Sequence, residues 1–140
     1  MTKSKHRAVW DWLLTCERVT KLFFSFGQES NAATVIVPTD TMIEEYLSGK
    51  QEREYAVQLT RFLPVSFNPN DLSNIEMLED IDAIADWIDA RAKAGEYPEF
   101  PEGMTITEIS TYRSMTGYEI AQNGMYARYI LPFTISYIKE

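Results

Sequence analysis

Thr41–Leu63 has the sequence TMIEEYLSGKQEREYAVQLTRFL, in which two alternating segments flank a turn at Ser48-Gly49-Lys50. Each arm has a period of two, which follows Met42, Glu44 and Tyr46 before the turn and Tyr55, Val57 and Leu59 after it. This period of two predicts a long β-hairpin. A two-residue turn at Ser48-Gly49 places Glu44 opposite Arg53, whereas a three-residue turn places Glu45 there, so two registers stay open.

A helix and a strand are predicted before the hairpin. Helical spacing extends from about His6 to Phe24, with a stripe formed by Val9, Leu13, Cys16, Thr20 and Phe23. Ala33–Val37 is a short run rich in β-branched residues, which predicts a strand that ends at Pro38. We therefore expect a helix packed on a sheet at the start of the chain.

The most regular helical pattern follows the hairpin, after a loop predicted at Phe67–Asp71. Ser73 and Glu76 have the spacing of a capping box, and Gly95 suits a C-cap. The apolar stripe between them predicts a helix whose buried positions are Ile75, Leu78, Ile81, Ala85, Ile88 and Ala92.

The rest of the chain predicts strands. The acidic, Pro-containing segment 96–103 is expected to be a linker within the domain, and Met104–Ser110 alternates as a strand. Tyr118–Ile120 and an Asn123-Gly124 turn lead into a long final strand. One face of that strand carries Ala127, Tyr129, Leu131, Phe133, Ile135 and Tyr137. Pro132 predicts that the strand lies at an edge or contains a bulge.

The order of these elements defines the expected fold class. Helix, strand, hairpin, helix, strand and strand lack the repeated βαβ unit of parallel folds, so we expect an α+β domain. It should have a mainly antiparallel sheet with a long hairpin and two main helices packed on one face. A chain of 140 residues and 16.2 kDa suits a single domain, 1–140, with residues 1–6 frayed.

The charge is unevenly distributed along the chain. The net charge is −8, and Asp71–Glu102 holds ten acids against two bases. Such a surface repels phosphate backbones, so no specific nucleic-acid binding is expected. The lone Cys16 cannot form an internal disulfide, and no apolar run approaches the about 20 residues of a membrane span. We therefore expect folding in a reducing cytoplasm and no membrane contact.

Candidate catalytic residues are few. His6 is the only histidine, so neither a nucleophile–histidine pair in a core nor a zinc site with four Cys or His ligands can be assembled. Ser48-Gly49-Lys50 is followed by Gln51 instead of the Ser or Thr of a phosphate-binding loop, and a hairpin turn explains it. Acids recur along one face of the predicted helix, which we interpret as solvated: Glu79, Asp82, Asp86 and Asp89. We predict no catalytic, cofactor-binding or metal-binding residues and no enzymatic activity.

The tip of the hairpin is the candidate interaction site. Tyr46 lies beyond the reach of two helices that cover a sheet, and an uncovered pair of strands is only marginally stable in water. A neighbouring subunit is the natural cover for such a ribbon. The predicted subunit interface consists of Tyr46, Leu47, Ser48, Gly49, Lys50 and Gln51.

Short segments along nearly the whole chain have the order and spacing found in one known family. These segments are Val35-Ile36-Val37-Pro38, Tyr46, Gly49-Lys50, Glu54-Tyr55, Asn68-Pro69-Asn70, Asn74-Ile75-Glu76, Trp87-Ile88-Asp89, Tyr97-Pro98, Asn123-Gly124, Ala127-Arg128-Tyr129 and Ile135-Ser136-Tyr137-Ile138. In them the chain resembles the small neck proteins of long-tailed phages and prophages of Gram-positive bacteria. That family includes minor capsid and tail terminator, or tail completion, proteins.

The resemblance implies a non-enzymatic structural protein of the virion, synthesised in the host cytoplasm and located at the virion neck. Such a protein caps the tail tube and joins the tail to the head. The resemblance also implies a ring, typically six-fold, of copies of the chain around the DNA channel, with tail-tube and head-connector proteins as partners. The terminator, stopper and adaptor positions within the neck all stay open.

A small cytosolic ligand-binding or regulatory domain is the alternative hypothesis. A ring subunit should expose apolar surface on two different sides, because head-to-tail contacts are heterologous. A ligand-binding domain should instead have one concave pocket, lined by aromatic side chains and lying beneath the final strand.

Overall fold

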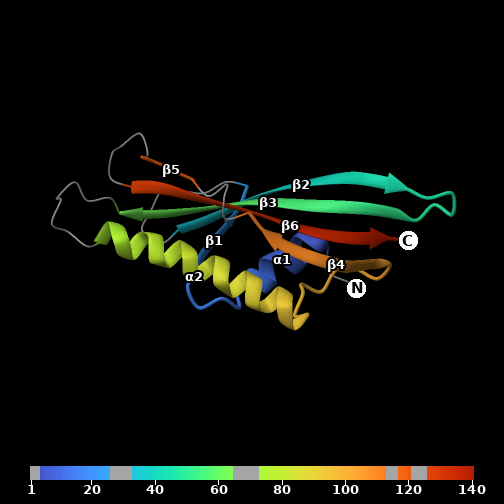
Figure 1. The fold of residues 1–140 in the computed structure, drawn as a ribbon, viewed down its shortest axis with the longest axis horizontal. Helices are drawn as coiled ribbons and strands as arrows, with labels where there is room; N and C mark the ends of the chain where they lie inside the picture. Colours follow the sequence, from blue (N-terminus) through green and yellow to red (C-terminus); the bar gives the residue numbers. More distant parts are fainter. Residues whose placement is uncertain (1–3, 26–32, 65–72, 113–116, 121–125) are drawn as a thin grey trace.

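The computed structural model describes residues 4–25, 33–64, 73–112, 117–120 and 126–140 (Figure 1). Its elements are α1 (Lys5–Leu13), β1 (Lys21–Phe24), β2 (Ala33–Glu45), β3 (Gln51–Pro64), α2 (Ser73–Ala94), β4 (Met104–Thr111), β5 (Gly117–Ile120) and β6 (Tyr126–Lys139). The strands form one six-stranded sheet in the order β1-β2-β3-β6-β4, and β5 also pairs with β6. The β1–β2 pair is parallel and the other described pairs are antiparallel, so the predicted α+β class is confirmed.

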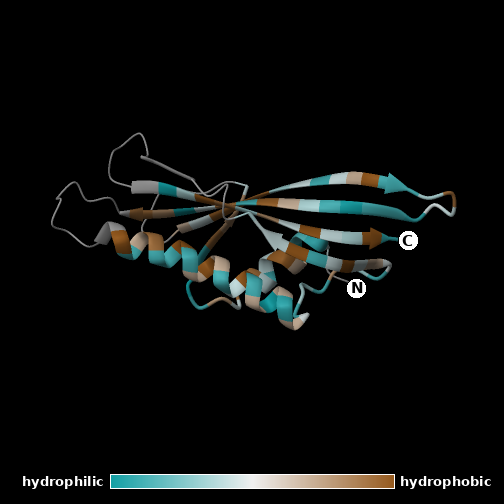
Figure 2. Cartoon of the chain, viewed as in Figure 1, coloured by the Kyte–Doolittle hydropathy of each residue, from teal (hydrophilic) through white to brown (hydrophobic). Residues whose placement is uncertain are grey.

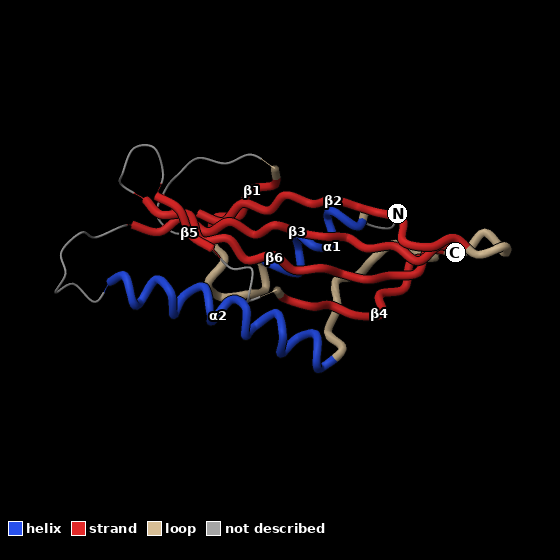
Figure 3. The backbone as a smooth tube through the Cα atoms, turned by 45° about the horizontal axis from the view of Figure 1, so that its top comes forward, coloured by secondary structure: helices blue, strands red, loops and turns tan. Residues whose placement is uncertain are grey.

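Both helices lie on the same face of the sheet, and the core lies between them and the strands (Figure 1, Figure 3). Alternating residues of β6 that face the helices are buried, as predicted: Tyr129, Leu131, Phe133, Ile135 and Tyr137. Tyr55, Val57 and Leu59 of β3 are paired with three of these and are buried as well. The helix α2 contributes Met77, Ile81, Ile84, Ala85 and Ile88 to the same core.

The predicted helix from His6 to Phe24 is wrong in its second half. The helix α1 ends at Leu13, and Lys21–Phe24 forms β1, which is paired with the start of β2. Cys16 is buried with the core, but the β-branched and aromatic residues that follow favour an extended backbone. Parallel pairing with β2 then stabilises Lys21–Phe24 as a strand.

The hairpin is longer than predicted. The strands β2 and β3 have 13 and 14 residues, and β2 continues through Pro38 instead of ending there. The described part of β1 stops at Phe24, opposite Ile36. Pro38 therefore lies at an edge that no other described strand covers, a position where a residue without an N–H is tolerated.

The turn of the hairpin has neither of the two predicted registers. The Tyr46 N–H donates to the Lys50 carbonyl at 2.8 Å, which closes a three-residue loop, Leu47–Gly49. Gly49 has φ +90°, the left-handed conformation that this loop type needs at its last position. A bulge between Met42 and Glu44 then shifts the pairing. As a result Met42 lies opposite Arg53.

The final strand is an inner strand, so the predicted edge position of Pro132 is wrong. The strand β6 pairs with β3 on one side and with β5 and β4 on the other, and its register with β3 is continuous through Pro132. The Tyr112 N–H donates to the Pro132 carbonyl at 2.9 Å. Because the N and O atoms of an extended residue point to the same side, the Pro132 nitrogen faces the junction between β5 and β4.

The helix α2 buries a different stripe from the predicted one at its start. Ile75 and Leu78 are 54% and 51% exposed, whereas Met77 and Ile84 are buried. The predicted C-cap is confirmed: Gly95 has φ +73°, and its N–H donates to the Ala92 carbonyl at 3.1 Å. The loop expected at Phe67–Asp71 and the Asn123-Gly124 turn lie outside the described residues.

Candidate interaction surfaces

The far end of the hairpin, residues 42–50 (the hairpin end), exposes apolar side chains. Leu47 is fully exposed at the tip, and Met42, Ile43 and Tyr46 are also exposed. Figure 2 shows hydrophobic colouring at the end of β2 and in the turn, next to hydrophilic strand residues. Ser48, Gly49 and Lys50 are exposed as well, so five of the six predicted interface residues lie on this surface.

Gln51 lies in the sheet instead. It is half-buried, pairs with Glu45 and Lys139, and its side-chain oxygen accepts a bond of 2.8 Å from Arg53. Because β6 accompanies β3 as far as this residue, the expectation of an uncovered two-stranded ribbon is wrong (Figure 3). The hairpin end therefore projects from at least three paired strands, which hold it in place.

A cluster of polar groups anchors the base of the hairpin to α1. The Tyr137 hydroxyl donates to Asp40 at 2.9 Å, and Arg53 Nε donates to the same carboxylate at 3.3 Å. Lys5 Nζ also donates to Asp40. Burial lowers the pKa of Lys5, and the nearby charges of Arg53 and Lys139 lower it further. We call Lys5, Asp40, Arg53 and Tyr137 the Asp40 cluster.

The predicted fraying of residues 1–6 is therefore wrong for Lys5 and His6, whereas residues 1–3 lie outside the described part. His6 Nδ1 lies 2.8 Å from the Tyr55 hydroxyl. Burial raises the pKa of Tyr55, which stays protonated at neutral pH, and burial also lowers the pKa of His6, helped by the charge of Lys5. This contact is a neutral hydrogen bond that holds α1 on the sheet.

The segment 96–103, expected to be a linker within the domain, contains no helix or strand and is packed on the protein. Its Pro98 is buried, and the Phe100 ring packs edge-on against Tyr55 and Tyr137, with centroid distances of 6.1 and 5.3 Å. The Glu96 carbonyl accepts a bond of 2.9 Å from Trp12 Nε1. These contacts fasten the chain between α2 and β4 to the base of the hairpin.

A buried ion pair, not predicted from the sequence, joins β3 to α2. The Arg61 side chain is 4% exposed, and its Nε lies 3.0 Å from Asp80 Oδ2. Arg61 also donates to the Thr34 hydroxyl at 2.9 Å, while Arg18 reaches Asp80 at 3.0 Å. The signal for this pair was present in the sequence, because Arg61 occupies an inward position of β3 between Leu59 and Leu63.

The predicted acidic face of α2 is only partly solvated. Glu79, Asp82 and Asp86 are exposed, but Asp89 is half-buried and accepts a bond of 2.8 Å from the Thr111 hydroxyl of β4. In the described part of the chain, no group of three or more His, Cys, Asp or Glu is placed to hold a metal ion. Nor is any described helix long and apolar enough to cross a membrane.

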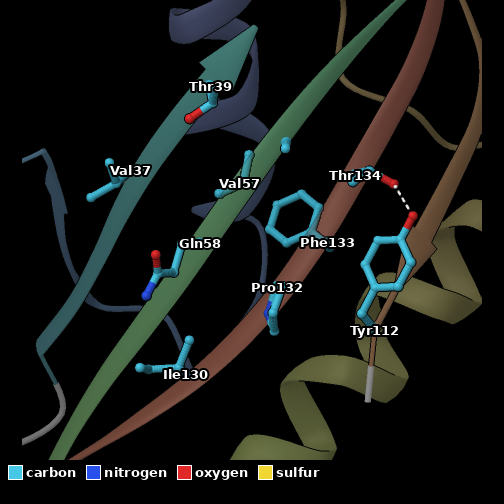
Figure 4. Close-up of a pocket in the computed structure, with 10 residues that line it drawn as sticks. Val37, Thr39, Val57, Gln58, Tyr112, Ile130, Pro132, Phe133 and Thr134 are labelled. Carbon is cyan, nitrogen blue, oxygen red and sulfur yellow. Dashed lines mark hydrogen bonds between the residues drawn. The ribbon is translucent and has the colours of Figure 1, made fainter. Parts of the chain in front are cut away.

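The face of the sheet opposite α1 and α2 (the open face) carries a groove of about 490 Å³ (Figure 4). Val37, 44% exposed, borders it on β2, and Tyr112, 39% exposed, borders it beyond β4. The Tyr112 hydroxyl lies 3.2 Å from the Thr134 hydroxyl. Phe133 also borders the groove, but its side chain is fully buried. Tyr112 is thus the exposed aromatic among its described lining residues, which differs from the aromatic-lined pocket expected of a ligand-binding domain.

Exposed apolar side chains lie at both ends of the molecule. The hairpin end lies at one end of its longest axis, and the start of α2, with Ile75 and Leu78, lies towards the other (Figure 1). Comparisons of this chain with protein-family models and with curated protein sequences find no match.

Proposed function

We propose that this chain is a non-enzymatic structural subunit that assembles with copies of itself through the hairpin end. The exposed Leu47 is the observation that carries this proposal, because an apolar tip held out on paired strands has no stabilising role within the subunit. Following the resemblance to phage neck proteins, we propose that the assembly is a ring that caps a tail tube and joins the tail to the head in the virion neck.

The positions of the exposed apolar side chains support a head-to-tail contact. A ring requires two different surfaces on each subunit, one of which meets the other surface on the next copy. The hairpin end supplies one such surface, and Ile75 and Leu78 at the start of α2 supply a second one at a distance from it (Figure 1).

The substitution Leu47→Asp tests the role of the hairpin end. Because Leu47 is fully exposed, this change should leave the free energy of unfolding within about 0.5 kcal/mol of the wild-type value. In a phage or prophage that carries the altered gene as its only copy, electron microscopy should show free heads and tails without joined particles. The matched control is Leu14→Asp, which changes an exposed leucine after α1.

Two results would contradict the proposal. Normally joined particles from the Leu47→Asp variant would remove the hairpin end from the interface. A gene neighbourhood without portal, capsid and tail-tube genes would remove the phage assignment, even where the purified protein forms rings.

A further inference from the structure

We infer that the open face is a docking surface for an amphipathic helix of another protein, one with an apolar stripe that continues into Lys or Arg residues. This inference rests on the open face, which shares Glu44 with the hairpin end but includes neither Tyr46 nor Leu47. It defines a second partner site on the opposite side of the sheet from α1 and α2.

The first observation is the set of apolar side chains in the groove, which lie beside the polar Thr39, Gln58 and Thr134. Val37, Gln58 and Pro132 form one cross-strand row of the open face, and Ile130 lies in the next row. Side chains of this kind on a sheet are usually covered by a packed layer. In the described part of the chain, both helices lie on the other face (Figure 1, Figure 4).

The second observation is a band of carboxylates next to the groove, on the side of the hairpin end. The register places four acids on the open face: Glu44 opposite Glu52, and Glu54 and Glu108 on either side of Ser136. We call these residues the acidic band. Among the described residues, no Lys or Arg nitrogen lies within 4 Å of any of the four carboxylates.

The acidic band is not explained by stability. The directly opposed Glu44 and Glu52 are like charges, which destabilise a pair of strands. Their charges raise the pKa of the neighbouring Tyr46, with that of Glu44 as the largest cause. A cationic partner would relieve this repulsion, so the charge pattern specifies the sign of the occupant.

The spacing of the two features fits a helix. Four residues separate Gln58 in the groove from Glu54 in the acidic band, which is about 13 Å along a strand. A helix covers that distance in between two and three turns, at about 5.4 Å per turn. An occupant that lies along β3 can therefore place apolar side chains in the groove and basic side chains, two to three turns further on, over the acidic band.

The helix α2 of a second copy does not fit this surface. Its exposed apolar positions are Ile75 and Leu78, and these are flanked by Glu76 and Glu79. Carboxylates on that helix would be repelled by the acidic band. The occupant is therefore a helix from a different protein.

Two synthetic helical peptides test this inference on the full-length protein. Both have the same leucine stripe, and the end beyond the stripe carries lysines in one and glutamates in the other. Fluorescence anisotropy should show saturable binding of the lysine peptide. This binding should weaken when the ionic strength rises from about 0.1 M to about 1 M, because the Debye length falls from about 10 Å to about 3 Å.

Substitutions locate the binding site. The double variant Glu52→Lys, Glu54→Lys should weaken binding of the lysine peptide by about tenfold and improve binding of the glutamate peptide. Val37→Asp, in the groove, should weaken both peptides. The matched control is Glu79→Lys, which makes the same charge change at an exposed position of α2 and should change neither affinity. Circular dichroism and thermal melts confirm that each variant is folded.

Three results would overturn the inference: no saturable binding of the lysine peptide, equal binding of both peptides by the wild-type protein, or an equal effect of Glu79→Lys. If sedimentation instead shows a dimer that Val37→Asp dissociates, the occupant is a second copy and the proposed partner helix is wrong. Leu47→Asp should leave peptide binding unchanged, so that failure of the open-face inference and failure of the proposed ring are distinguishable.

Discussion

Removal of the Asp80 carboxylate is the sharpest test of how this fold is held together. Asp80 lies on α2 and binds both Arg61 of β3 and Arg18, so one carboxylate joins three parts of the chain. The substitution Asp80→Ala deletes it without adding bulk. The guanidinium of Arg61 then keeps its position, 4% exposed, without this counter-charge.

The expected cost follows from the burial of the two partners. Arg18 is 52% exposed, so its contact with Asp80 contributes no more than about 1 kcal/mol. The Arg61–Asp80 contact, at 3.0 Å, is buried, and breaking such a pair by removing one partner costs about 3–5 kcal/mol. Asp80→Ala should therefore reduce the free energy of unfolding by about 3–5 kcal/mol, a large share of the about 5–15 kcal/mol of a typical domain.

Urea unfolding followed by circular dichroism measures this cost, with Asp82→Ala on the exposed side of α2 as the matched control. The double variant Arg61→Met, Asp80→Leu should recover most of the lost stability, because apolar replacement of both partners is often neutral. A loss below about 1 kcal/mol for Asp80→Ala would refute the reasoning. It would show that water or other groups compensate the Arg61 charge.

Two further predictions concern the core and pH. Ile81→Ala or Ile88→Ala should each cost about 2–5 kcal/mol in urea unfolding, whereas Asp82→Ala should stay within about 0.5 kcal/mol; the reverse order would mean that α2 buries another face. His6, the only histidine, should titrate below the ordinary pKa of about 6.5 in NMR spectra of the folded protein, and Lys5→Gln should raise its pKa by removing a nearby cation. The pKa of His6 is lower in the folded state than in the unfolded state, so the stability contributed by neutral His6 is present above about pH 6.5 and is lost as the pH falls through the folded-state pKa. A free energy of unfolding that increases as the pH falls over this range would contradict the assignment.

Local patterns predicted the fold where one face of an element is buried along its whole length. The alternation of β6 and the Gly95 end of α2 depend on neighbouring residues, so they could be recognised in the sequence. The strand β1 could not, because its pairing partner in β2 lies beyond an intervening segment and the preceding residues continue a helical spacing. Ile75 and Leu78 fit the apolar period of α2, but they are exposed while Met77, between them in the sequence, is buried.

The sites were less predictable than the fold. The position of Leu47 at the tip follows from the Gly49 turn, so the exposed end could be predicted. Two members of the acidic band depend on bulges: Glu44 follows the one between Met42 and Glu44, and Glu108 the one between Ile106 and Glu108, because a shift of one residue turns the later side chains of a strand to the other face. The sequence left these two bulges open, whereas Glu52 and Glu54 alternate with the buried Tyr55 and so could be placed on the opposite face.

The Asp40 cluster explains how a protruding hairpin can act as a binding element. Four elements supply its members: Lys5 from α1, Asp40 from β2, Arg53 from β3 and Tyr137 from β6. These contacts fix the direction of the strands at the point where the covering helices end. A tip that is already fixed loses little conformational freedom on binding, and such preorganisation leaves more of the contact energy for affinity. In the proposed assembly, the polar groups at the base of the hairpin thus hold the few apolar side chains at its end in position for a partner.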